Sequence, residues 1–155
     1  FETDVIHVVD LLRHFGGEVT DVDAYVQTRY SDQENVFSAL VRFESGSTGI
    51  LTANRASGFR HERFELHGNG IGAYIRAPES ADVYVANNPE PIVLRGADLA
   101  GTDGVHMTYG FSGESRHFID CVKTKAQPLT NLYDAAKSRE LVDRILECGR
   151  RREHE

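Results

Sequence analysis

Short segments that alternate apolar and polar residues recur between residues 18 and 94, and they limit the possible folds more than any other feature. Such alternation is typical of β-strands with one face on a core. Polar turns such as Ser45-Gly46-Ser47 separate the segments, and turns this short favour antiparallel neighbours. The predicted strands are Glu18–Tyr30, Val36–Glu44, Thr48–Asn54, Glu62–His67, Ile71–Arg76, Asp82–Val85 and Ile92–Leu94.

Helical periodicity precedes and follows these strands. Residues 3–17 predict a helix that ends at Gly16-Gly17, because glycine supplies the left-handed conformation of many helix ends. Its apolar residues recur at helical spacing and predict a face toward a core: Val5, Val8, Val9, Leu12 and Phe15. Residues 95–110 are rich in glycine and polar residues and predict a long loop. Two helices follow, one capped by Ser112 and one capped by Thr130 or Asn131.

One helix, a run of strands and two closing helices give an α+β order. The pattern predicts an open, mostly antiparallel sheet of about six or seven strands with its helices packed on one face. With 40% hydrophobic residues among 155, the chain can bury one core, so residues 1–155 are predicted to form a single domain.

The charge and the cysteines exclude several classes of protein. A formal net charge of −7 argues against a nucleic-acid backbone or an anionic membrane surface as partner. No apolar run reaches the roughly 18 residues of a membrane span, and the N-terminus lacks the parts of a signal peptide. Cys121 and Cys148 suggest neither a disulfide framework nor a zinc site, so a reduced, cytoplasmic protein is predicted.

The first predicted helix carries a cluster of titratable side chains. His7, Asp10 and His14 are three and four residues apart, so a helix makes them neighbours on one face. A histidine beside an aspartate is commonly a surface or capping pair. A metal site would need more converging ligands than one helix supplies, so no metal is predicted.

Two separated motifs resemble one enzyme family. The run Asp4-x-x-His7-x-x-Asp10-Leu11-Leu12-Arg13-x-Phe15-Gly16-Gly17 resembles the helix that opens the C-terminal domain of the Gfo/Idh/MocA (glucose-fructose oxidoreductase and inositol dehydrogenase) family. The segments 117–124 and 128–136 are similar to the end of that domain. The middle of the chain matches only in its pattern.

The resemblance implies an NAD(P)-dependent enzyme that acts on a sugar, a cyclitol or a related polyhydroxy compound. It also implies an open antiparallel sheet that pairs with a second subunit, giving a homodimer or a higher homo-oligomer. In the family, NAD or NADP lies on a separate N-terminal Rossmann domain that brings a catalytic lysine. Neither is present in these residues, and the start without an initiator methionine suggests a piece of a longer protein, inactive alone.

The resemblance assigns roles to residues of this chain. His7 would act on the substrate hydroxyl, and Asp10 would bind the substrate. Many members carry an aspartate four residues before the histidine, where this chain has Thr3. Asp4 could orient His7 instead, or it could cap the helix.

Loop residues and one sheet face complete the predicted contacts. Arg55 and Tyr109 are predicted substrate contacts, because polar groups at strand ends and in loops are often functional. A sheet face carrying Phe37, Phe43 or Phe64 would supply the subunit contact.

The glycine run Gly68-Asn69-Gly70-Ile71-Gly72-Ala73 looks like the start of a dinucleotide fingerprint. That fingerprint needs a helix to open inside it, so that backbone N–H groups meet the pyrophosphate. Here a β-like run ended by Pro78 follows, so we predict a hairpin turn and no cofactor site.

Two other functions stay open. Some relatives use NAD transiently to cleave or isomerise glycosides, and the chain could also be a non-enzymatic sugar-binding or dimerisation module.

Overall fold

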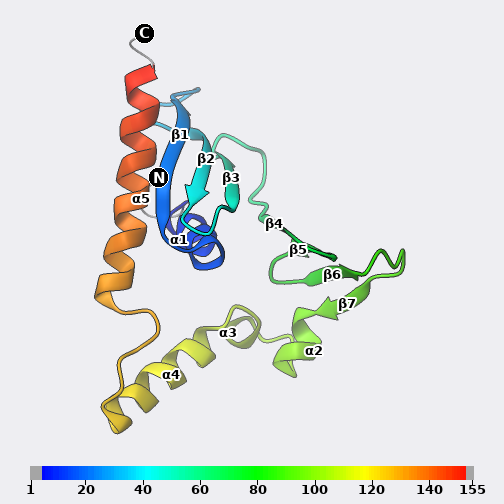
Figure 1. Cartoon of the computed structure of the whole chain (residues 1–155). Helices are drawn as coiled ribbons and strands as arrows, with labels where there is room; N and C mark the ends of the chain where they lie inside the picture. Colours follow the sequence, from blue (N-terminus) through cyan, green and yellow to red (C-terminus); the bar gives the residue numbers. More distant parts are fainter. Residues whose placement is uncertain (1–4, 153–155) are drawn as a thin grey trace. The chain divides into compact units, whose positions relative to one another are not determined.

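The computed structural model describes residues 5–152, which divide into two compact units (Figure 1). The first unit holds the chain up to residue 60 and from residue 129 onward, and the second holds residues 61–128. None of the described helices is long and apolar enough to cross a membrane.

The first unit is a three-stranded antiparallel sheet with two helices. The sheet order is β1-β2-β3, and β2 pairs with β1 from Val36 to Phe43 and with β3 from Val36 to Arg42. In this register Phe37 lies opposite Val26 on one side and Ala53 on the other. The elements are α1 (Val5–Gly16), β1 (Val19–Gln27), β2 (Val36–Phe43), β3 (Thr48–Asn54) and α5 (Leu132–Arg152).

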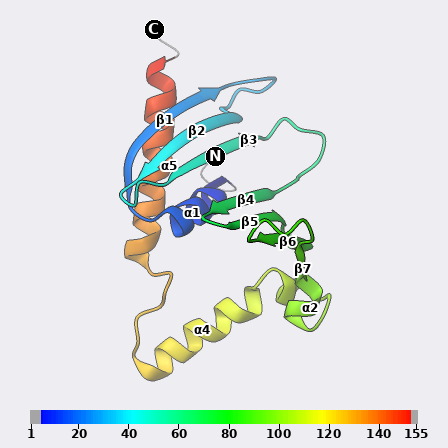
Figure 2. The ribbon, with the colours of Figure 1, turned by 45° about the vertical axis from the view of Figure 1, so that its right-hand side comes forward.

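The core of the first unit lies between the sheet and its helices. α5 runs along β1, and α1 packs against α5 and β3 (Figure 2). Alternate residues of β2 are buried, as the sequence pattern predicts, and bury their side chains against these helices. The buried core residues are Val5, Val9, Ala24, Val26, Phe37, Ala39, Val41, Phe43, Leu51, Leu141, Val142, Ile145 and Leu146.

α1 ends as the sequence predicts. Gly17 adopts a φ of 90°, and its N–H donates to the Arg13 carbonyl oxygen at 2.8 Å. This left-handed residue stops the helix. One expectation for the apolar face is wrong, because Phe15 is 53% exposed. The residue sits in the last turn of the helix, where the chain is already turning toward β1.

Gly149 lets α5 approach β1 closely. A Cβ added there would lie 2.4 Å from Val26 Cγ2 and 2.9 Å from the Val26 backbone nitrogen. Gly149→Ala should therefore lower the free energy of unfolding by about 1–3 kcal/mol through overpacking, offset by the roughly 1 kcal/mol that alanine gains over glycine in a helix. Gly113→Ala in α4 (Phe111–Thr124) is the control, because nothing lies within 4 Å of a Cβ added there. Thermal melting would measure both variants, and the melting temperature should rise for Gly113→Ala.

The second unit contains four strands and three helices. Its sheet has the order β4-β5-β6-β7, and every neighbouring pair is antiparallel. The elements are β4 (Arg63–Gly68), β5 (Ile71–Arg76), β6 (Ser80–Val85), β7 (Ile92–Arg95), α2 (Gly96–Ala100), α3 (Val105–Thr108) and α4.

The α+β class is confirmed, but the prediction of a single sheet of six or seven strands is wrong. The described strands form two sheets of three and four strands. Within each sheet the pairing is between consecutive strands joined by short connections. The alternation of residues identifies strands, yet it carries no information on whether β3 pairs with β4 across segment 55–62, which is as long as the connection between the paired strands β1 and β2.

The glycine run at 68–73 forms the predicted hairpin. Gly68 pairs with Ile71, so Asn69 and Gly70 make a two-residue turn between β4 and β5. Gly70 has a φ of 72°, which such a turn requires. Strand β5 continues where a dinucleotide site would need a helix, so this run is not such a site.

The segment before the closing helices differs from the prediction. Residues 95–110 were expected to be a loop, but they contain α2 and α3. These helices have only five and four residues, too few to show an apolar period. α4 begins after Gly110 and not after Ser112. Asn131 caps α5 as predicted, since its Oδ1 accepts from the N–H groups of Tyr133 and Asp134 at 2.9 and 3.2 Å.

The predicted role of phenylalanines in a subunit contact fails for two of three residues. Phe37 and Phe43 are 0% and 4% exposed, and they point into the core of the first unit. They lie on the sheet face that α1 and α5 cover, because their positions in β2 share the parity of Val41. Phe64 of β4 is partly buried.

Candidate active site

Helix α1 carries three consecutive polar positions at a spacing of three residues: His7, Asp10 and Arg13. Each residue turns the helix by about 100°, so Asp10 lies about 60° from each of the other two around the axis. His7 is on the exposed side of α1, whereas Arg13 is only 9% exposed. Asp10 therefore stands at the boundary between solvent and the packed side of the helix.

His7 is accessible to a substrate. Its side chain is exposed, and it makes no hydrogen bond or ion pair with any residue from 5 to 152. His14, two turns further along α1, is also exposed and contacts the Phe15 ring edge to face, with centroids 5.4 Å apart. An exposed imidazole can accept or release a proton.

Asp10 is half exposed and is held from one side. Its side chain is 43% exposed, and its Oδ1 accepts a hydrogen bond from the Ser138 hydroxyl of α5. Arg13 Nη2 lies 4.0 Å from the same oxygen. The carboxylate thus has a fixed position beside a positive charge, while part of it still faces solvent.

Arg13 joins α1 to α5. Its Nε donates to the Ser138 hydroxyl oxygen at 3.0 Å, and its Nη2 donates to the Asp134 backbone oxygen at 3.3 Å. The same Nη2 pairs with the Asp134 carboxylate. Ser138 and Arg13 are 2% and 9% exposed, so the hydrogen bond between them is shielded from water, whereas the Asp134 side chain is 32% exposed. A buried guanidinium satisfied by several acceptors holds the two helices in a defined register.

Sequence reasoning missed Arg13, Asp134 and Ser138. Two signals were present: Arg13 lies in the first motif one turn after Asp10, and Asp134 and Ser138 are four residues apart in a predicted helix. Both signals are local. Nothing in the sequence alone shows that these turns of α1 and α5, more than a hundred residues apart, meet in space.

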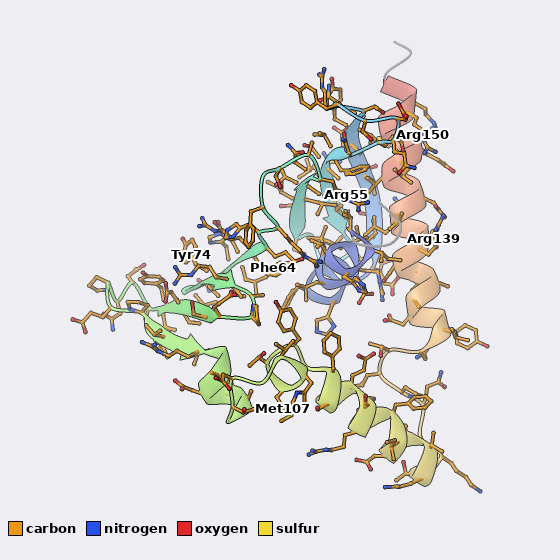
Figure 3. All side chains as sticks on the ribbon, turned by 180° about the vertical axis from the view of Figure 1, so that it is seen from behind. Arg55, Phe64, Tyr74, Met107, Arg139 and Arg150 are labelled. Atoms are coloured by element: carbon orange, nitrogen blue, oxygen red, sulfur yellow. The ribbon has the colours of Figure 1, made fainter. Side chains whose placement is uncertain are left out.

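The other predicted site residues lie elsewhere. Asp4 lies outside the described residues. Arg55 is exposed in the turn after β3, where its N–H donates to the Asn35 carbonyl oxygen at 2.8 Å (Figure 3). Tyr109 belongs to the second unit, at the end of α3, and stacks on Phe111 with ring centroids 6.2 Å apart. The structure brings His7 and Asp10 together on one helix.

No metal centre emerges from the described part of the chain. Within residues 5–152 no three histidine, cysteine, aspartate or glutamate side chains gather so that they could hold a metal ion. The chemistry that α1 offers is proton transfer at His7 and hydrogen-bond acceptance at Asp10.

A protein-family model matches part of the chain. Residues 4–71 match the model of the GFO/IDH/MocA C-terminal domain. No curated protein matches the chain.

Solved structures with the same fold come from several oxidoreductases. One is an oxidoreductase from Agrobacterium radiobacter in complex with NAD+, L-tartaric acid and magnesium, with a TM-score of 0.78 and 18% identity over 96% of this chain and 46% of that one. Levoglucosan dehydrogenase in complex with NADH has a TM-score of 0.83 and 17% identity over 96% of this chain and 47% of that one. UDP-N-acetylglucosamine 3-dehydrogenase from Acidithiobacillus ferrooxidans has a TM-score of 0.73 and 14% identity over 94% of this chain and 45% of that one.

The chain spans less than half the length of these structures. At such low identity the similarity to these structures shows the fold, and the family match is confined to residues 4–71. Residues 4–71 thus match the C-terminal domain of the GFO/IDH/MocA family, in agreement with the family predicted from the two sequence motifs.

Proposed function

We propose that this chain is the substrate-binding C-terminal part of a longer NAD(P)-dependent oxidoreductase that converts a hydroxyl group of a sugar, cyclitol or related polyol to a carbonyl, or the reverse. The observation that carries the proposal is the pair on α1: an exposed His7 and, one turn later, a half-exposed Asp10 whose carboxylate is held in place. The family places its substrate residues on the same helix.

In this proposal His7 moves a proton and Asp10 orients the substrate. When an alcohol is oxidised its hydroxyl proton must leave, and an accessible imidazole within hydrogen-bond reach can accept it. Asp10 would accept a hydrogen bond from a second hydroxyl and so fix the reacting group beside His7. Asp4 would orient the His7 ring, and Arg55 and Tyr109 would add contacts to the substrate.

The cofactor belongs outside the described residues. The glycine run of this chain forms a hairpin and offers no helix N-terminus to a pyrophosphate. NAD or NADP would therefore be held by an N-terminal Rossmann domain of the parent protein, which would also bring the catalytic lysine. Solved structures of the same fold in complex with NAD+ or NADH support a nicotinamide cofactor.

A homo-oligomer and a cytoplasmic location are part of the proposal. The outer face of the first sheet exposes Ile50 (77%) and Tyr25 (48%), apolar area that a second subunit could cover. The cytoplasmic location is proposed because Cys121 and Cys148 suggest no disulfide framework in the sequence.

The test is net turnover by the full-length protein. Levoglucosan, myo-inositol and D-glucose would each be incubated with NAD+ and with NADP+, and the reduced cofactor would be followed by its absorbance. We expect reduced cofactor to accumulate with at least one of these polyols. A changed sugar without net reduction would identify the glycoside-cleaving or isomerising alternative. Sugar binding without any reaction would identify a non-enzymatic module.

A further inference from the structure

We propose that Ser138 is a positioning residue for the substrate: held by Arg13, it fixes the Asp10 carboxylate so that one oxygen remains free for a substrate hydroxyl. The inference rests on the proposed function, because it assumes that Asp10 binds the substrate. It adds a residue of α5 to a site that the sequence motif places on α1 alone.

The direction of the hydrogen bonds follows from the chemistry of the groups. Arginine can only donate, so the 3.0 Å contact from Arg13 Nε uses Ser138 Oγ as an acceptor. A serine hydroxyl has a single proton, and that proton is left to point at Asp10 Oδ1. The chain Arg13 to Ser138 to Asp10 therefore has one direction, and it ends on a carboxylate oxygen.

The second oxygen of Asp10 is available. Asp10 Oδ2 accepts no hydrogen bond from any residue between 5 and 152, and the side chain is 43% exposed. A carboxylate anchored through one oxygen loses less rotational freedom when its other oxygen binds a ligand, because part of the ordering is already done. Ser138 thus prepares Asp10 for the substrate.

A role in helix packing alone would not need this hydroxyl at Asp10. Arg13 already joins α1 to α5 through the carboxylate and the backbone oxygen of Asp134. Ser138 adds a contact to the one acid of α1 that lies between the exposed and the packed sides of the helix. The two roles make different predictions for substrate affinity.

The experiment is a double-mutant cycle in the full-length enzyme, with the polyol of the panel that is turned over fastest and a saturating concentration of the cofactor that is reduced with it, NAD+ or NADP+. Ser138→Ala should raise the KM for the polyol about tenfold and change kcat little, because it removes a hydrogen bond to a charged group that supports binding. Asp10→Ala should raise KM by at least as much. Adding Ser138→Ala to Asp10→Ala should change KM no further, since Ser138 acts through Asp10.

Controls separate positioning from folding. Ser138→Thr keeps the hydroxyl and should restore KM, while Ser138→Cys fills the space with a weak donor and replaces the alanine variant if that variant melts too early to assay. Arg139 follows Ser138 in α5 and pairs with Asp143 on the exposed side of the helix (Figure 3). Arg139→Ala should leave the KM for the polyol unchanged.

The possible outcomes test the positioning role of Ser138 separately from the proposed oxidoreductase function. If Asp10→Ala raises KM but Ser138→Ala does not, or if Ser138→Ala raises KM equally in both backgrounds, the positioning role is overturned and the proposed function stands. If Asp10→Ala leaves KM unchanged, both the substrate role of Asp10 and the inference fail. If the unaltered enzyme reduces no cofactor with any polyol, the proposed function itself fails.

Discussion

Replacing His7 with alanine in the full-length protein should lower kcat by about 100- to 10,000-fold, the usual contribution of a positioned general acid or base. The loss should appear in kcat more than in KM, because proton transfer contributes in the transition state and not in substrate binding. His7 is exposed on α1, and its side chain makes no hydrogen bond or ion pair with any residue from 5 to 152. Its removal should therefore leave the melting temperature nearly unchanged.

His14→Ala is the matched control for this experiment. It removes the same type of side chain from the same exposed side of α1, two turns away, and loses only an edge contact with Phe15. Its kcat should stay within about twofold of the unaltered enzyme, as expected of a surface substitution. Equal kcat values for the two variants would remove His7 from the mechanism.

The fold could be predicted in its local parts from the sequence. The alternation in β2 identifies both the strand and its buried face, because the period of two is a direct consequence of strand geometry. Gly17 and Asn131 mark helix ends for reasons that are equally local. The division into two sheets could not be predicted, since the pairing of strands depends on contacts between distant segments.

The same limit applies to the candidate site. His7 and Asp10 lie on one helix, so their spacing was enough to place them together. Ser138 reaches Asp10 only because α5 packs beside α1, and that packing is set by the whole core of the first unit. The sequence therefore predicted the neighbouring side chains of α1, but it did not predict that Ser138 of α5 contacts Asp10.

The orientation of the phenylalanines illustrates why burial must be assigned to a particular face. A strand pattern shows that Phe37 and Ser38 point to opposite sides of a sheet. It does not show which side meets the helices and which side is left for a second subunit. The structure assigns the phenylalanine side to α1 and α5, and this assignment has a measurable consequence for stability.

Phe37→Ala should lower the free energy of unfolding by about 3–5 kcal/mol, the usual cost of removing a buried aromatic ring and leaving a cavity. Phe37 is 0% exposed at the centre of the first sheet, between β1 and β3. A loss of this size is a large part of the roughly 5–15 kcal/mol that stabilises a typical domain. Urea unfolding would measure it, and amide hydrogen exchange should accelerate in β1, β2 and β3.

Phe59→Ala tests the same chemical change without the burial. Phe59 belongs to the first unit and is 82% exposed, so its removal should change the free energy of unfolding by less than about 0.5 kcal/mol. If Phe37 instead supplied a contact between subunits, its replacement would weaken the oligomer and spare exchange in the monomer's sheet. Rapid exchange in β1–β3 of the Phe37 variant, with normal protection in the Phe59 variant, is the result that the buried position of Phe37 requires.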